Sequence, residues 1–406
     1  MDLNFDVVIV GAGPAGATAA ICLSESNLKV ALIDKSEFPR DKVCGDGLSP
    51  DIYNQLKVLP GNIAEEYMSL QEKLFCNGVK IVAPNNEEAT VRFHNPDLHS
   101  YSSTRTDFDN LLFQNAAKKS NVETFTGSGV TEIKSDKNHH LLVLGDGTEI
   151  KAKMVVGADG AHSVVASQLG GIRIDRDHHY AGLRVYFENV TGLAHDVELH
   201  FLKEILPGYL WIIPLPGNRA NVGIGMLSSY ISEKKVNLKQ VLEHALKTSP
   251  VLAPRFADAK ALETIKGMGL PLGSRKLSRS GDRYLLLGDA GHLIDPFTGE
   301  GIGNAIRSAR IAADHIQEAF KVNQFDAAFN KAYDAEIKRR MMGEMRFSIF
   351  AARLMKKPVV ANFVVKRLLQ NAAIHQLIYT GLNPNAILRT ISKRKFYGDI
   401  FRKVAL

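Results

Sequence analysis

Four short apolar runs along the chain have the pattern of buried β-strands. They cover residues 5–10, 29–34, 153–158 and 284–288 and are dominated by aliphatic, often β-branched, side chains. Runs of this length without polar alternation are typical of parallel strands that are covered on both faces. The first run leads directly into a glycine-rich turn and then an apolar helical pattern over residues 17–23. The sequence therefore predicts an α/β domain built around a parallel sheet.

A second pattern, in which apolar and polar positions alternate, occupies two other stretches. Residues 80–103 and 180–226 show it, which predicts antiparallel strands with one buried face. Helical periodicity is expected over residues 107–119, 232–257 and 301–320.

The glycine-rich turn has the form Gly11-x-Gly13-x-x-Gly16 and stands between a strand and a helix. These glycines allow a tight turn, a close approach of a pyrophosphate and close packing of helix on strand, while the helix N-terminus faces the phosphates. Asp34 ends the next strand, 18 residues after Gly16, where a carboxylate can bind ribose hydroxyls. The unit predicts a dinucleotide site that also includes Pro14, Ala15 and Lys35.

Composition narrows the class of protein. The 406 residues are 45% hydrophobic and 23% charged, which excludes a disordered or collagen-like chain. Three cysteines are too few for a disulfide framework and favour a reducing, cytoplasmic location. Residues 7–23 are apolar, but Asp2 and Asp6 precede them in place of a basic segment, so a signal peptide is not expected. No apolar run reaches the ~20 residues that span a bilayer.

The net charge of +7 is unevenly distributed. Residues 336–406 carry 15 Lys or Arg against 3 Asp or Glu, so the remainder of the chain is acidic and nucleic-acid binding is not expected. Two interpretations of the basic region stay open. Beside apolar helix positions such as Ala361, Val365 and Leu369, it predicts peripheral contact with an anionic membrane, on the inner face of the cell membrane. Alternatively, the charges form a solvated surface and the apolar positions pack on the protein itself.

Two further segments follow predicted strands and make the cofactor more specific. They are Asp159-Gly160-Ala161-x-Ser163 and Gly288-Asp289-Ala290, and the second continues to Thr298-Gly299-Glu300-Gly301-Ile302. In this order and spacing they resemble flavoproteins of the para-hydroxybenzoate hydroxylase type. The resemblance implies FAD as cofactor, with Asp289 on the ribityl hydroxyls. It also implies that Gly299, Gly301 and Ile302 begin a helix whose N-terminus faces the flavin ring.

Arg105-x-x-Phe108-Asp109-x-x-Leu112 is similar to a segment of the same superfamily in which the arginine contacts the cofactor. A guanidinium group suits a phosphate or a ribityl oxygen. The alternative for Arg105 is an ordinary surface ion pair at a helix start.

Two segments favour one branch of that superfamily. Lys42-Val43-Cys44-Gly45-Asp46-Gly47 and Tyr209-x-Trp211-x-Ile213-Pro214 resemble motifs of geranylgeranyl reductases, although Asp46 and Ile213 replace the usual Gly and Phe. Ile213-Pro214 also resembles flavin-dependent halogenases, and His292 resembles the aromatic hydroxylases. A flavin monooxygenase or halogenase acting on an aromatic ring therefore remains the alternative function, and a non-catalytic flavoprotein is a third.

The resemblance implies a reductase that saturates C=C bonds of a prenyl chain on a lipid, a quinone or a diphosphate. Tyr209 and Trp211 share one strand face, suited to a prenyl chain, unless they are a core pair. Cys44 is expected at the reacting end, as a proton donor or a lining residue, with a small buried residue as the alternative. The resemblance also places Cys44 and Gly45 among the cofactor-binding residues. His162 and His292 are taken as structural.

The predicted fold is a Rossmann-like FAD-binding domain with an inserted antiparallel-sheet substrate domain and a helical C-terminal region. The FAD-binding parts are 1–75, 105–178 and 272–325, the substrate domain 76–104 and 179–271, and the basic helical region 326–406. The electron donor, NAD(P)H or a ferredoxin, and the oligomeric state stay open, since no second nucleotide motif is present. No metal site is expected.

Overall fold

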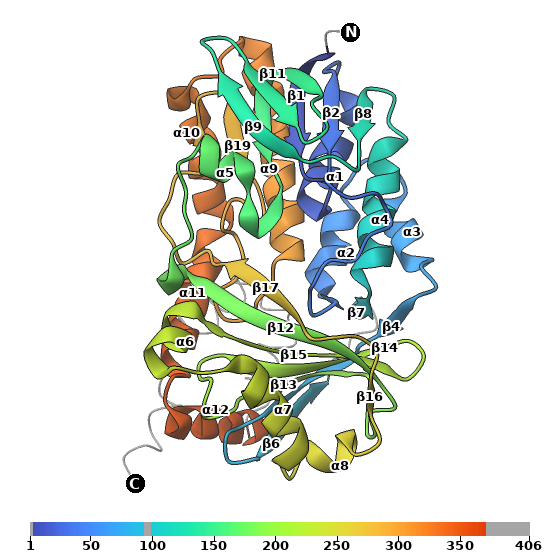
Figure 1. Ribbon diagram of the computed structural model, residues 1–406, viewed down its shortest axis with the longest axis vertical. Helices are drawn as coiled ribbons and strands as arrows, with labels where there is room; N and C mark the ends of the chain where they lie inside the picture. Colours follow the sequence, from blue (N-terminus) through green and yellow to red (C-terminus); the bar gives the residue numbers. More distant parts are fainter. Residues whose placement is uncertain (1–2, 93–98, 371–406) are drawn as a thin grey trace.

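Two β-sheets, one above the other in Figure 1, organise the part of the chain that the structure describes. The computed structural model describes residues 3–92 and 99–370 of the 406. The upper sheet is mainly parallel, the lower sheet is mainly antiparallel, and helices follow at the C-terminal end. The predicted α/β class is confirmed.

The upper sheet contains the predicted buried strands at its centre. Its order is β18 (Ser280–Gly281), β19 (Tyr284–Leu286), β11 (Glu149–Gly157), β1 (Leu3–Val10), β2 (Val30–Ile33) and β8 (Val122–Phe125), and β10 (His140–Leu144) with β9 (Val130–Ser135) extends from β11. The pairs β19–β11, β11–β1, β1–β2 and β2–β8 are parallel. The carboxyl ends of these strands therefore share one edge, where the glycine-rich turn and the loops after β2, β11 and β19 begin.

Alternate residues of β1 pack on opposite faces of this sheet because side chains alternate along a strand. Val7 and Ile9 belong to the core formed with the helices α1 (Pro14–Cys22), α4 (Arg105–Ala117) and α9 (Ile302–Val322). Val8 and Val10 belong to a second core with β9, β10 and the short α5 (Val164–Gln168). Both faces are covered, which explains the absence of polar alternation in these strands.

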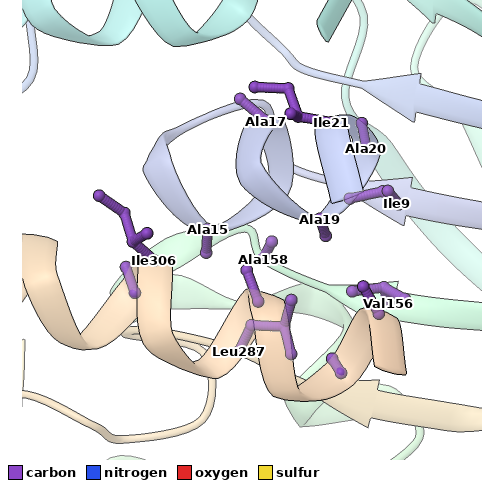
Figure 2. Packing of buried hydrophobic residues seen from close by; sticks show 14 of the residues in the cluster. Ile9, Ala15, Ala17, Ala19, Ala20, Ile21, Val156, Ala158, Leu287 and Ile306 are labelled. Carbon is purple, nitrogen blue, oxygen red and sulfur yellow. The ribbon is translucent and has the colours of Figure 1, made fainter. Parts of the chain in front are cut away.

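Small side chains allow α1 and α9 to approach closely. Figure 2 shows Ala15 and Ala19 on the side of α1 that faces α9, with Ala158 and Leu287 filling the space beside them. Gly288 lies at the same contact, where an added Cβ would meet Ala15 and Ala305 at 3.3 and 3.2 Å. The two helices that begin at Gly13 and Gly301 are thus packed side by side.

The lower sheet unites both stretches of alternating sequence. Its order is β16 (Lys260–Ala261), β12 (His179–Glu188), β15 (Arg219–Leu227), β14 (Tyr209–Leu215), β13 (Asp196–His200), β5 (Gly78–Val82) and β6 (Glu88–Arg92). β17 (Lys266–Pro271) pairs with β12 on the same edge as β16, away from β15. The two stretches meet where β13 pairs in parallel with β5. Leu210 and Ile212 of β14 pack against α7 (Leu238–Thr248). Tyr209 and Trp211 therefore occupy the opposite face, where Tyr209 bonds to Thr298 and Trp211 lies beside Gly45.

One expectation from the sequence is wrong in detail. The single helix predicted over residues 232–257 is three helices, α6 (Ser228–Lys234), α7 and α8 (Ala253–Phe256), because Lys235 is left-handed and Asn237 caps the start of α7. The antiparallel strands expected over residues 80–103 are present but belong to two sheets. β5 and β6 are in the lower sheet, whereas β7 (Tyr101–Ser103) pairs with β3 (Gly47–Leu48) and β4 (Lys73–Phe75).

The remaining helices flank the two sheets. α2 (Pro50–Leu56) and α3 (Ile63–Met68) precede β4, and α10 (Ala327–Arg340), α11 (Met342–Leu354) and α12 (Pro358–Gln370) follow α9. Ala361 and Val365 of α12 are fully buried, Ala361 beside Phe201 and Leu206 and Val365 beside Ala83. Ala361 and Val365 thus pack on the protein itself, while Lys393-Arg394-Lys395 lie outside the described residues. Within the described ranges, no helix is long and apolar enough to cross a bilayer.

Candidate active site

The glycine-rich turn has the shape that a dinucleotide requires. Gly11 has φ +98°, and an added Cβ would lie 2.3 Å from the carbonyl oxygen of Ala158. At Gly16 an added Cβ would lie 1.7 Å from the carbonyl oxygen of Gly11. Gly13, by contrast, meets only the Arg40 side chain, at 3.3 Å, and no side chain caps α1 there. The turn is closed on its protein side and leaves the first amides of α1, at Ala15 and Gly16, uncapped by side chains, which fits a pyrophosphate.

Asp34 lies at the predicted place, at the end of β2, and is nearly buried. Its Oδ2 accepts a hydrogen bond from the amide of Ala12 at 2.8 Å, and its Oδ1 accepts one from the amide of Ser36 at 2.9 Å. The carboxylate therefore joins β2 to the glycine-rich turn. Lys35 follows it, with its Cβ packed close to Gly129. Ribose binding by Asp34 stays a prediction.

Asp159 has a local role in the fold. It lies after β11, and its carboxylate accepts hydrogen bonds from Ser163 Oγ and from the amide of Val164, at the start of α5. Burial raises the pKa of this carboxyl. Gly160 beside it has φ +80°, which favours glycine. The sequence placed both residues at the cofactor, and the contacts described show Asp159 only as the residue that orders this turn.

Asp289 forms an ion pair that the sequence did not predict. Its Oδ2 lies 2.9 Å from Nζ of Lys42, across 247 residues of sequence. An added Cβ on Gly301, the residue before α9, would lie 3.7 Å from the other Asp289 oxygen. Asp289 therefore links the segment 42–47 to the N-terminus of α9. The sequence predicts that Asp289, residues of this segment and the start of α9 lie at the same cofactor.

Arg105 is fully buried, which rules out the alternative of a surface ion pair. Its Nε and Nη2 each donate to the Asp109 carboxylate at 2.6 Å, and Arg40 donates to the same carboxylate at 2.8 Å. Although burial lowers the pKa of Arg105, the Asp109 carboxylate and the neighbouring Cys44 raise it above its usual value. The predicted motif therefore fixes a buried cation beside Cys44, and contact of Arg105 with a cofactor stays a prediction.

The predicted aromatic pair lies where the lower sheet meets the loop before α9. The rings of Tyr209 and Trp211 are 6.4 Å apart and nearly perpendicular. The Tyr209 hydroxyl donates to the carbonyl oxygen of Thr298 at 2.7 Å, and an added Cβ on Gly299 would lie 3.2 Å from that hydroxyl. Trp211 Nε1 donates to Oδ1 of Asn221 at 2.9 Å.

Asn221 joins this pair to the loop that carries Cys44. Its Nδ2 donates to the Cys44 carbonyl oxygen at 2.7 Å and to Oδ2 of Asp46 at 2.8 Å. Gly45 between them lies next to the Trp211 indole, since an added Cβ would be 3.6 Å from Nε1. The structure therefore brings Cys44, Gly45, Tyr209 and Trp211 together.

Asp46 is the most unusual group of the site. Its carboxyl is fully buried, and Oδ2 accepts from the Tyr186 hydroxyl at 2.6 Å as well as from Asn221. Burial raises the pKa of Asp46 to about 6, against the effect of these hydrogen bonds and of Arg184 and Arg105.

The two histidines differ in setting. His292 is buried with φ +52°, and burial lowers its pKa to about 4, so it is neutral near pH 7. His162 is exposed beside α5. Neither makes a hydrogen bond to the described residues that surround Trp211, and their structural assignment stays a prediction.

The sequence missed several residues of this site: Arg40, Lys42, Arg184, Tyr186, Asn221 and Gly223. A signal existed for Gly223 alone, because glycine inside a strand marks a close approach. The approach is that of Trp211, whose ring atoms would lie 2.0 Å from an added Cβ. Arg184, Tyr186 and Asn221 depend on strand register, which places Trp211 and Arg184 opposite Gly223, and Ile213 and Tyr186 opposite Asn221. Arg40 and Lys42 lie outside any strand, between β2 and β3.

Comparison with known proteins decides the family. A profile of the FAD binding domain matches residues 4–348. The chain belongs to this family. FAD is therefore its cofactor and the chain is an FAD-dependent oxidoreductase, as the sequence predicted. The glycine-rich turn fits that cofactor, because backbone atoms crowd Gly11 and Gly16 whereas only the Arg40 side chain lies near Gly13.

Two curated relatives extend the comparison. Menaquinone reductase of Mycobacterium tuberculosis is 29% identical over 324 residues, which cover 77% of this chain and 77% of its own. Digeranylgeranylglycerophospholipid reductase of Thermoplasma acidophilum is 27% identical over 412 residues, covering 99% and 98%. The predicted resemblance to geranylgeranyl-type reductases is confirmed at the level of sequence.

Solved structures show the same fold. A geranylgeranyl bacteriochlorophyll reductase-like protein from Thermoplasma acidophilum superposes with a TM-score of 0.81 at 22% identity, covering 100% of this chain and 99% of that one. CmlS, a flavin-dependent halogenase, superposes with a TM-score of 0.69 at 20% identity, covering 84% and 63%. At these identities the likeness concerns the fold, which reductases and halogenases share.

Proposed function

We propose that this protein is an FAD-dependent reductase that saturates C=C bonds of a prenyl chain carried by a quinone or a glycerophospholipid. Relatives that align over 77% or more of this chain are named as reductases of such molecules. The observation that carries the proposal is the aromatic face of β14, fixed at both ends to loops of the FAD-binding domain. Tyr209 is bonded to Thr298, and Trp211 is joined through Asn221 to Cys44.

Reduced FAD supplies a hydride for one carbon of an isolated double bond. The chain's own residues then have to bind, orient and dehydrate the substrate. Tyr209 and Trp211 offer flat apolar surface whose polar atoms are already occupied, so a hydrocarbon chain meets no unpaired donor there. Cys44 and Gly45 line the same place. An isolated alkene is barely polarised, and positioning with water exclusion is the main contribution that a protein can make.

The test is anaerobic turnover. Purified holoprotein with reduced flavin is mixed with menaquinone or with digeranylgeranyl glycerophospholipid, and the product is analysed by mass spectrometry. A gain of one H₂ for each reduced double bond supports the proposal. Oxygen uptake coupled to a hydroxylated or halogenated aromatic product, with no alkene reduction, would instead establish the monooxygenase or halogenase alternative.

We further propose that the outer face of α11 and α12 contacts an anionic membrane, where prenyl lipids are found. Phe350 is 57% exposed and Val359 is 78% exposed. Six basic residues, none of them buried, lie on the same two helices and the turn between: Arg346, Arg353, Lys356, Lys357, Lys366 and Arg367. Exposed apolar residues within a basic surface match the composition of peripheral membrane contacts. The buried stripe of Ala361 and Val365 is not part of this face.

A further inference from the structure

Asp46 combines complete burial with an incomplete set of hydrogen bonds. Oδ2 receives two, from Tyr186 and Asn221, whereas Oδ1 has no hydrogen-bond partner among the described residues. The backbone at Asp46 is left-handed, with φ +64°, and its carbonyl oxygen accepts from the amide of Ser103, so the loop is fixed on both sides. A buried carboxylate oxygen that accepts no hydrogen bond costs free energy when it is ionised. When the carboxyl is protonated on this oxygen, the resulting hydroxyl can donate its proton.

The cations near Asp46 form their ion pairs with other carboxylates. Arg184, from β12, stacks on the Tyr186 ring at 3.9 Å and is bonded to Asp41 and Glu263. Arg105, from α4, is occupied by Asp109. Asn221, from β15, is neutral. Each nearby cation is thus paired with another carboxylate, and burial dominates.

The carboxyl also lies beside the face assigned to the substrate. Asp46 shares the amide of Asn221 with Trp211 and with the Cys44 carbonyl. Gly45, its neighbour in sequence, lies against Trp211 and Ile213. The hydrogen bonds of Asn221 and the contact of Gly45 therefore join Asp46 to the place where Cys44, Tyr209 and Trp211 meet.

We propose that Asp46 is the proton donor of the alkene reduction, an inference that rests on the proposed function. One carbon of the double bond gains the hydride supplied with reduced FAD, and the π bond breaks. The other carbon takes the proton from Oδ1, so the O–H bond breaks and Asp46 is left as a carboxylate. Oxidised FAD and a saturated C–C bond result, and the carboxylate recovers its proton from water after product release. Tyr186 and Asn221 are positioning residues, because their two hydrogen bonds hold Oδ2 and leave Oδ1 for the proton.

The first test does not depend on turnover. Trp211 is the only tryptophan of the chain, so ¹⁵N-tryptophan labelling gives a single indole N–H resonance, which Asn221 couples to Asp46. In the oxidised holoprotein we expect this resonance to titrate with a midpoint near 6. Asp46→Asn should abolish the titration, and asparagine tolerates the left-handed backbone. Asp196→Asn, which removes a carboxyl of the lower sheet that also has a raised pKa, should leave it intact. A titration that survives Asp46→Asn overturns the proposal.

The second test is single-turnover reduction of a prenyl substrate, measured as a function of pH. The protonated carboxyl is the active form, so the wild-type rate should fall as pH rises through the Asp46 midpoint. Asp46→Asn should slow the step about 10²–10⁴-fold and flatten the pH profile, with FAD content and substrate KM little changed. If wild type reduces the prenyl substrate and Asp46→Asn reduces it at the same rate, the donor role of Asp46 is overturned while the proposed function stands. Wild type that reduces no prenyl chain overturns the proposed function as well.

Discussion

The hydroxyl of Tyr209 donates to the carbonyl oxygen of Thr298 at 2.7 Å and thereby joins the lower sheet to the loop before α9. The two residues lie 89 positions apart, and the glycine that follows Thr298 leaves just enough space for the phenol. The face that would carry a prenyl chain is in this way aligned with the helix start that would face the flavin. This hydroxyl makes one of the two links, and Trp211 makes the other through Asn221 and Cys44.

Tyr209→Phe is expected to lower kcat/KM for a prenyl substrate about fivefold, equivalent to the loss of about 1 kcal/mol from one hydrogen bond. The ring stays, so FAD binding should not change. Tyr333→Phe is the matched control, because Tyr333 is also buried and donates to a carbonyl oxygen, that of Leu286, at 2.9 Å. It should lower stability by a similar amount without affecting kcat/KM. Steady-state kinetics and thermal unfolding measure both, and equal kinetic effects would refute a specific role for Tyr209.

The pair of Asp289 and Lys42 allows the ribityl assignment to be tested. Asp289→Ala should weaken FAD binding at least tenfold, the equivalent of about 1.4 kcal/mol, because a charge-assisted hydrogen bond to the cofactor is lost. Lys42→Met removes only the ion pair at 2.9 Å and should have a smaller effect, since its ammonium group is partly exposed. Titration of apoprotein with FAD gives both dissociation constants. If Asp289→Ala binds as tightly as wild type, the carboxylate does not contact the cofactor.

Cys44→Ser separates the thiol from Asp46. Serine keeps the size and the backbone contacts, including the carbonyl oxygen that Asn221 bonds. We expect unchanged FAD content and less than a tenfold slowing of alkene reduction, because the thiol lines the site while the proton comes from Asp46. Single-turnover rates of Cys44→Ser and Asp46→Asn, measured side by side, provide the comparison. A larger loss in Cys44→Ser would place the proton donor on the thiol.

The raised pKa of Asp46 also affects stability. The folded carboxyl titrates near 6 and the unfolded one near its usual 3.8, so the folded state binds more protons between these values. The free energy of unfolding should therefore fall as pH rises through this interval, by on the order of 3 kcal/mol for a shift of about two units. In Asp46→Asn this dependence of the free energy of unfolding on pH should be absent. Denaturant titrations at about pH 4.5 and about pH 7.5 should show the variant gaining stability relative to wild type at the higher pH. A parallel loss in both proteins would contradict the assignment.

The sequence could predict those parts of the site whose residues lie close together along the chain. The turn Gly11–Gly16, Asp34 and Asp289 were placed correctly at the edge of the upper sheet, because strand, turn and acid are adjacent along the chain. The link between Trp211, Asn221 and Asp46 could not be found, since it joins segments 175 residues apart through the register of β14 and β15. The sequence noted Asp46 only as a departure from a family motif.

The C-terminal helices show a second limit. Helical periodicity identified Ala361 and Val365 as one face of α12 but could not say whether that face meets protein or lipid, since both environments favour the same side chains. Their burial against β5, β6 and neighbouring loops settles the question for these residues. The outward residues, Val359 above all, were not distinguished by the pattern.

The membrane contact can be measured by liposome flotation. Binding of the holoprotein should increase with anionic lipid and decrease with salt, because exposed charges are screened. Lys356→Glu with Lys357→Glu should weaken binding at least tenfold, since each surface cation contributes about 1 kcal/mol. Phe350→Ser with Val359→Ser should weaken it at all salt concentrations, because apolar surface is lost.

Matched controls keep this experiment specific to the outer face of α11 and α12. Ile174→Ser changes an apolar residue that is 55% exposed but lies far along the chain, after α5, and Lys118→Glu with Lys119→Glu reverses two charges at the end of α4. Both should bind like wild type. If the controls weaken binding as much as the changes on α11 and α12, attraction is a property of total charge and no face is specific. Binding that ignores salt and lipid charge would remove the electrostatic part of the proposal and leave the apolar residues as its sole cause.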